Sequence, residues 1–173
     1  MEALQIASRT EASSVVAVEL NPVAIQCARR GHRMLERSKS VKCVGAADRL
    51  QIIEGDVLKV LQSFAPRSFD RVLAPRPKEG ALDGDLGCGD SGAPFLDALL
   101  PLLKESGECH WYDFCADHEF PKCERTKRTL EAACVRSGLS MRVIHVANAG
   151  SVAQRQLRVC VDFKICGRID NDA

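Results

Sequence analysis

The sequence has no long hydrophobic run, no clear excess of either charge and few aromatic residues. No stretch approaches the roughly 18–20 apolar residues that cross a bilayer, and the first residues do not form a secretory signal peptide. The formal net charge of its 173 residues is +1, whereas nucleic-acid-binding domains usually carry a basic excess. Hydrophobic residues make up 46% and charged residues 27%, which excludes collagen-like, mucin-like and wholly disordered chains and predicts one soluble globular domain.

Cysteine is abundant, but its spacing is uninformative. The nine cysteines are an odd number, none forms a CxxC pair, and no Cys/His cluster has zinc-finger spacing. Several lie in apolar runs, such as Cys160 between two valines, where a thiol behaves as a small hydrophobic group. We therefore predict reduced, structural thiols in an intracellular compartment and no metal site.

Strand-like and helix-like segments alternate along the chain. The apolar, β-branched run VVAVEL at residues 15–20 is typical of a strand buried on both faces. Asn21 suits a helix N-cap and Pro22 the first helical position. Further strands are expected at residues 50–53, 69–74, 107–114, 141–147 and 156–165, and helices at 22–37, 57–64, 94–104 and 119–137.

This alternation predicts an α/β fold with a mostly parallel sheet and helices on both faces. One domain would span residues 1–167, followed by a tail at 168–173. The glycine- and aspartate-rich segment 80–93 reads as a flexible acidic loop within that domain. Ligands of such sheets bind where the strands end at their carboxyl edge, which directs attention to Glu19, Asp56 and residues 74–78 and 112–114.

Two carboxylates follow successive strands of the predicted sheet. Glu19 ends the first expected strand, where a carboxylate can accept hydrogen bonds from both hydroxyls of a ribose. Asp56 follows the next strand and could receive the amino group of an adenine. The alternatives are a solvated acid at position 19 and an N-cap at position 56. Taken together, the two acids indicate an adenosine-containing ligand.

A second feature of this edge is Pro75-Arg76-Pro77-Lys78. Prolines restrict the backbone and would hold the two cations at a cleft, where they suit a phosphate or a polarised base oxygen. The alternative is a rigid surface turn with solvated charges. Tyr112 follows Trp111, so the two rings face opposite ways in a strand, one into the core and the other near a ligand.

The remaining polar groups favour no site of their own. No histidine has a Ser or Cys partner at a spacing that suggests a catalytic pair, so we interpret all of them as structural or surface groups: His32, His110, His118 and His145. The basic residues of the segment 29–42 are interpreted as a solvated helix face, with an RNA-binding track as the alternative.

Five segments, in this order, resemble one known family: VVAVELNPVAIQCAR, DRLQIIEGDV, FDRVLAPRPKEG, FLDALLPLLKESGECHWYDF and RVCVDFKI. The series is similar to the catalytic domain of tRNA (guanine-37-N1)-methyltransferases over about residues 1–167, interrupted by the acidic loop. The resemblance implies a Rossmann-like class I methyltransferase sheet, S-adenosylmethionine as methyl donor, tRNA as partner and a monomer without metal or membrane. It also implies methyl transfer to N1 of guanosine 37.

The resemblance assigns roles by position. The cofactor-binding residues are Glu19, Leu20, Asp56 and Val57, and the residues lining the target guanine are Pro75, Pro77 and Tyr112. The family commonly has Asn-Leu-Pro where this chain has Pro75-Arg76-Pro77, so no Asn side chain is present there. Arg76 and Lys78 would then stabilise the negative charge that develops on O6.

The resemblance also implies that the family's first strand, glycine-rich loop, general base and tRNA-binding region lie before residue 1. We expect residues 1–11 to form the helix that follows that loop, the sheet to lack its first strand, and the chain to be marginally stable and prone to aggregate. No general base is assigned. The predicted location is the cytoplasm, with a mitochondrion, a plastid or the nucleus as alternatives.

Three other functions fit parts of the sequence. The related aminocarboxypropyl transferase of wybutosine synthesis uses the same donor. An inactive remnant would bind only RNA or protein. An NAD-dependent dehydrogenase also places an acid after its second strand, but it needs a glycine fingerprint upstream, and the later motifs argue against it.

Overall fold

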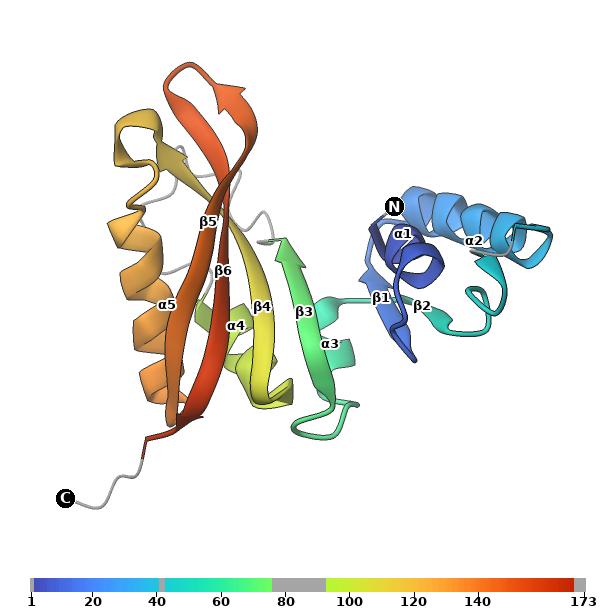
Figure 1. Ribbon diagram of the computed structural model, residues 1–173, viewed down its shortest axis with the longest axis horizontal. Helices are drawn as coiled ribbons and strands as arrows, with labels where there is room; N and C mark the ends of the chain where they lie inside the picture. The colour runs from blue at the N-terminus through green and yellow to red at the C-terminus, as the bar shows by residue number, and fades with distance from the viewer. Residues whose placement is uncertain (1, 41–42, 76–92, 170–173) are drawn as a thin grey trace. The chain divides into compact units, whose positions relative to one another are not determined.

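The computed structural model describes residues 2–40, 43–75 and 93–169. The chain divides into two compact units, Met1–Ser63 and Phe64–Ala173, and each combines strands with helices (Figure 1). The predicted α/β class is confirmed. None of the helices in the described residues has the length and apolarity needed to span a membrane. The single domain over residues 1–167 stays a prediction.

The first unit is a two-stranded parallel sheet with three helices. Its helices are α1 (Glu2–Arg9), α2 (Pro22–Glu36) and α3 (Val57–Leu61), and its strands are β1 (Val15–Glu19) and β2 (Leu50–Glu54). The strands pair in register from Val15 opposite Leu50 to Glu19 opposite Glu54. Both strands therefore reach the same edge together, and each is followed there by a helix.

A small apolar core holds this unit together. Ala7, Val15, Ala46 and Leu50 are buried in it. Helix α1 approaches α2 closely at Gly31, where an added Cβ would lie 2.5 Å from a methyl carbon of Leu4.

The expected helix within residues 1–11 is present as α1. The expectation that residues 15–20 are buried on both faces is wrong, because only Val15 of β1 is buried.

Arg49 ties the elements of the first unit together through its guanidinium group. Its Nη1 donates hydrogen bonds to the carbonyl oxygens of Thr10 (3.2 Å) and Ala12 (2.9 Å), and its Nη2 donates to that of Ala7 (2.8 Å). Its Nε donates to Gly45 O at 3.2 Å. Ala7 lies in the last turn of α1, where carbonyls have no partner within the helix, and a cation there also complements the helix dipole. Thr10 and Ala12 lie in the segment that follows the helix.

The second unit is built on a four-stranded mixed sheet in the order β3-β4-β6-β5. Its strands are β3 (Phe69–Pro75), β4 (Leu103–Ala116), β5 (Leu139–Ala153) and β6 (Gln156–Arg168); its helices are α4 (Ala93–Leu99), α5 (Glu124–Arg136) and the short 3₁₀ helices η2 (Leu100–Leu102) and η3 (Asp117–Glu119). β3 is parallel to β4, whereas β6 is antiparallel to both β4 and β5. The expected mostly parallel sheet is therefore only partly found.

The two faces of strand β4 differ in burial. From Gly107 to Ala116 its residues alternate between buried and half-buried, as the two-residue period of a strand requires. Trp111 lies 5.9 Å from Phe95 of α4 between ring centroids, and Asp113 accepts a hydrogen bond from Thr126 of α5. Since Trp111 and Asp113 share one face of the strand, α4 and α5 cover that face. His110 and Tyr112 lie on the other.

Several element ends differ from the sequence expectations. The helix expected at 94–104 ends at Leu99 and continues as η2, because Pro101 disfavours further α-helix. The helix expected at 119–137 begins at Glu124, since Pro121 restricts the residue before it. The final two strands are longer than expected and form a hairpin whose turn places Arg155 at φ 58°. The acidic loop 80–93 lies outside the described residues, except Ala93, which begins α4.

Candidate functional site

Glu19 lies at the carboxyl end of β1. One of its carboxylate oxygens, Oε1, accepts a hydrogen bond from the backbone N–H of Asn21 at 2.8 Å, and its carbonyl accepts from Gly55 N at 3.0 Å. Asn21 in turn caps α2 by accepting from Val23 N at 2.9 Å, as predicted. Within the described chain the second oxygen, Oε2, has no hydrogen-bond partner, so it can accept from a ligand hydroxyl.

Asp56 occupies the matching place after β2. Its Oδ1 accepts a hydrogen bond from Leu58 N at 3.0 Å and caps α3, which confirms the N-cap interpretation. Since β1 and β2 run parallel and in register, the carboxylates of Glu19 and Asp56 lie at the same edge of this sheet. Leu20 follows β1 there and is 68% exposed, and Val57 opens α3. The four predicted cofactor residues are therefore all found at one edge of the first unit.

A neighbouring acid at this edge has a partner. Glu54, the last residue of β2, accepts a hydrogen bond through Oε2 from Nη2 of Arg29 at 3.1 Å, and both side chains are about half-exposed. Glu19 and Glu54 are the carboxylates that end β1 and β2. Glu54 has an ion-pair partner, whereas Glu19 has none among the described residues.

The predicted guanine-lining residues lie in the second unit. Pro75 ends β3 opposite Tyr112 of β4, and the guanidinium carbon of Arg158 from β6 lies 4.7 Å from the centroid of the Tyr112 ring. Tyr112 is half-buried, whereas Trp111 is buried, so the expected core position of one ring is confirmed and a ligand beside the other stays a prediction. Arg76, Pro77 and Lys78 lie outside the described residues.

The structure also assembles a group that sequence reasoning missed. His110 of β4 lies beside Cys160 and Asp162 of β6, and their ligand atoms all lie within 4.8 Å of one another. Asp162 Oδ1 is 2.7 Å from His110 Nδ1 and accepts a hydrogen bond from Cys160 Sγ at 3.2 Å. Burial, followed by the hydrogen bond to Asp162, raises the pKa of the Cys160 thiol to about 12. Only a predicted pairing of β4 with β6 would have revealed this cluster.

Burial dominates the chemistry of the other core cysteines. Every described cysteine is a free thiol, in line with the expectation of reduced thiols. Burial raises the pKa of Cys115 and of Cys134 to about 12. Such thiols stay protonated at neutral pH and are poor nucleophiles.

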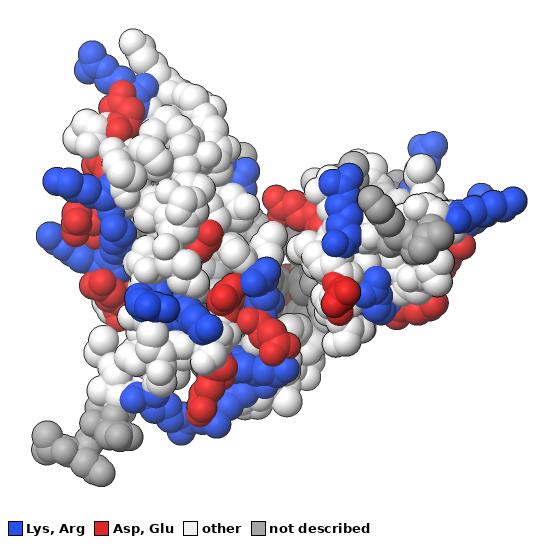
Figure 2. Space-filling view, in the orientation of Figure 1, with Lys and Arg blue, Asp and Glu red and all other residues white. Residues whose placement is uncertain are grey.

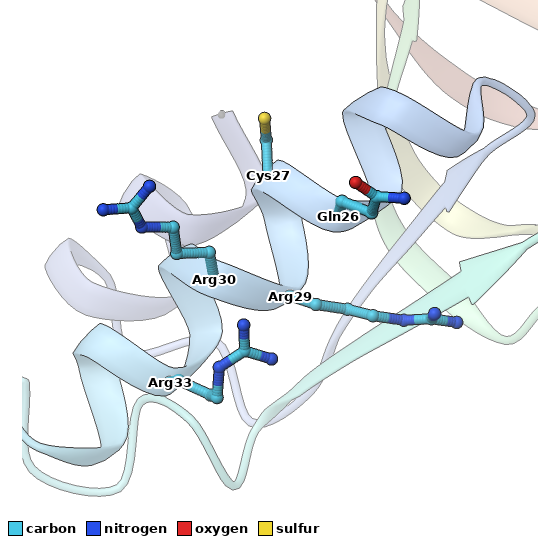
Figure 3. Close-up of a pocket in the computed structure, with 5 residues that line it drawn as sticks. All are labelled: Gln26, Cys27, Arg29, Arg30 and Arg33. Carbon is cyan, nitrogen blue, oxygen red and sulfur yellow. The ribbon is translucent and has the colours of Figure 1, made fainter.

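A shallow surface depression of about 400 Å³ lies along α2 and is lined by Gln26, Cys27, Arg29, Arg30 and Arg33 (Figure 3). Its lining contains no carboxylate or imidazole. On the face shown in Figure 2, acidic and basic side chains are interspersed over the second unit rather than gathered by sign. The open, arginine-lined depression agrees with the interpretation of the basic residues of α2 as a solvated face.

No protein-family model matches the chain, and no curated protein matches it either. Several solved structures do match the chain. TYW2 of M. jannaschii, solved in complex with AdoMet, superposes with a TM-score of 0.69 at 20% identity, covering 96% of this chain and 63% of that one.

Two further structures belong to the same group of matches. The putative transferase PH0793 of Pyrococcus horikoshii has a TM-score of 0.68 at 16% identity, covering 95% of this chain and 52% of that one. The tRNA m1G37 methyltransferase of M. jannaschii has a TM-score of 0.60 at 19% identity, covering 90% and 37%. The chain thus spans between about half and two thirds of the length of the first two. Its fold is that of the TYW2 and tRNA m1G37 methyltransferase structures, as the sequence resemblance predicted.

Proposed function

We propose that this chain is the catalytic domain of an S-adenosylmethionine-dependent transferase that methylates N1 of guanosine 37 in tRNA. The observation that carries the proposal is the likeness of fold to a tRNA m1G37 methyltransferase and to TYW2 bound to AdoMet. The ordered sequence motifs, from ELNP at Glu19 to the strand that contains Tyr112, support the same assignment.

The edge of the first unit suits the adenosine part of the donor. Carboxylate oxygens accept hydrogen bonds from hydroxyl and amino groups, and Glu19 Oε2 is available for the ribose hydroxyls. Asp56 has its Oδ2 available for the adenine amino group, while exposed Leu20 and the neighbouring Val57 supply apolar contacts for the base. The residues present therefore fit the adenosine part of S-adenosylmethionine.

The residues that the resemblance assigns to the target base would act on guanine. When bound, S-adenosylmethionine supplies an electrophilic methyl group. N1 of guanine must lose its proton and O6 gains negative charge, so the reaction needs a base and a nearby cation. In this proposal Arg76 and Lys78 provide the cation, and Pro75, Pro77 and Tyr112 line the base. We assign no general base.

A second candidate is transfer of an aminocarboxypropyl group from the same donor, which the likeness to TYW2 favours. The two reactions leave groups of different mass on the nucleoside. Mass spectrometry of nucleosides from a tRNA incubated with the chain and S-adenosylmethionine separates them directly.

The donor site is tested by calorimetric titration of S-adenosylmethionine into the full chain. We expect Glu19→Gln to weaken binding by about 10- to 100-fold, because the acceptor loses its charge and the hydrogen bonds that it accepts from the ribose hydroxyls weaken. Glu11→Gln is the matched control, since Glu11 is exposed in the same unit and should bind like the wild type. No heat from a chain whose circular dichroism shows it to be folded would contradict the proposed donor site.

A further inference from the structure

His110, Cys160 and Asp162 are brought together by the register of two antiparallel strands. His110 of β4 is directly opposite Asp162 of β6, and Tyr112 is opposite Cys160; the two strands run side by side in Figure 1. Alternate residues of a strand share a face, so Cys160 and Asp162 lie on the face of the sheet that carries His110. This is the face opposite α4 and α5.

The group is shielded but reachable from solvent. The side chains of His110 and Asp162 are 25% and 22% exposed, whereas Cys160 is only 7% exposed. Asp162 Oδ1 contacts both partners, at 2.7 Å from His110 Nδ1 and 3.2 Å from Cys160 Sγ. A small ion could therefore reach the three side chains without the core opening.

The donor set is one that transition metals use. Zn²⁺ binds imidazole nitrogen, thiolate sulfur and carboxylate oxygen at about 2.0–2.3 Å, and sites that keep a place for water have three protein ligands. Tetrahedral geometry at these bond lengths places ligand atoms about 3.3–3.7 Å apart. Here Asp162 Oδ1 lies 2.7 Å from His110 Nδ1 and 3.2 Å from Cys160 Sγ, and all three ligand atoms lie within 4.8 Å of one another. Small side-chain rotations would complete the arrangement.

We propose that His110, Cys160 and Asp162 form a three-ligand site for Zn²⁺, with water as the fourth ligand. On binding, the Cys160 S–H bond breaks, its proton passes to solvent and a sulfur–zinc bond forms. The cation also offsets the repulsion between thiolate and carboxylate. The site does not depend on the proposed transfer reaction. Without a metal, the same residues form only a hydrogen-bonded group, and the experiment must separate these two cases.

The experiment is titration of the reduced full chain with Co²⁺ and then with Zn²⁺. We expect one equivalent of Co²⁺ to produce a thiolate-to-cobalt absorption band, and one equivalent of Zn²⁺ to abolish it. Cys160→Ser should remove the band and weaken Zn²⁺ binding by more than about tenfold. Cys166→Ser is the matched control, because Cys166 is an exposed cysteine on the same strand and its loss should change neither.

Two further variants keep the test decisive if Cys160→Ser proves unfolded by circular dichroism. Asp162→Asn and His110→Gln should each weaken Zn²⁺ binding by more than about tenfold, and Zn²⁺ should raise the Tm of the wild type more than that of either variant. The proposal is overturned if the wild type binds no Co²⁺ or Zn²⁺. It is equally overturned if these variants bind like the wild type while Cys166→Ser does not, since the metal would then sit on exposed thiols.

Discussion

Thr126 Oγ1 donates a hydrogen bond of 2.7 Å to Asp113 Oδ2, and both residues are buried between α5 and the sheet. Thr126 is 1% exposed and Asp113 7% exposed. A carboxyl group is costly to bury unless hydrogen bonds replace its contacts with water. This bond joins α5 to β4, next to the bond that Arg125 Nη2 donates to Phe114 O.

Thr126→Val keeps the shape of the side chain but removes the donor. We expect the free energy of unfolding to fall by about 1–3 kcal/mol, because a buried hydrogen bond to a carboxyl group is lost. Urea denaturation measures the change. Thr129→Val is the control on the same helix; Thr129 Oγ1 bonds only to the carbonyl of Arg125 at 3.2 Å, so its replacement should cost less. Equal effects of the two would refute the role given to Thr126.

Arg49, whose side chain is partly buried, should matter to the stability of the first unit because it bonds to several backbone carbonyls. Arg49→Lys keeps the charge but loses the planar fork that reaches several carbonyl oxygens. We expect a loss of about 1–3 kcal/mol, seen as faster hydrogen exchange of the amides of α1 and β1. The control is Arg30→Lys, because Arg30 lines the open depression on α2. Unchanged exchange in Arg49→Lys would show that the carbonyl contacts add no stability.

Burial of the core thiols predicts how stability depends on alkaline pH. The pKa of Cys134 is raised by burial, and further by Glu131, from 9.0 to about 12. The folded state therefore holds this proton more tightly than the unfolded state. The resulting stabilisation is complete below pH 9 and is lost as the pH rises from 9 to about 12.

Comparison of Cys134→Ala with the wild type isolates this contribution from other groups that titrate at high pH. We expect urea denaturation between pH 8 and 11 to show a shallower decline for the variant, by up to about 1.4 kcal/mol per pH unit. Cys27→Ala, which removes an exposed thiol, should decline like the wild type. Parallel curves for Cys134→Ala and the wild type would argue against the raised pKa.

Local signals in the sequence predicted much of the fold. The Asn21-Pro22 start of α2 and the Asp56 cap of α3 are formed by neighbouring residues, so they can be read from short motifs. The direction of β6 could not be predicted, because an apolar run looks the same in a parallel and an antiparallel strand. The length of the β5–β6 hairpin depends on pairing between the strands rather than on either strand alone.

The two candidate sites also differ in whether the sequence alone could predict them. The edge with Glu19 and Asp56 was predictable because each residue follows its own strand and parallel strands end together. The group around Asp162 was not, because His110 is 52 residues away from it in the sequence and only the register between β4 and β6 makes them neighbours. A rule based on short spacings between ligands does not detect such a group.

The pairing of β1 has a consequence for the behaviour of the chain at high concentration. Among the described strands, β1 pairs only with β2, and β3 only with β4. Each of these strands thus has one side whose backbone amide and carbonyl groups lack a strand partner within the described residues. Such rows of donors and acceptors are templates for adding another strand. A β-rich peptide, or a second copy of this chain, could extend either sheet through backbone contacts alone, whatever its side chains.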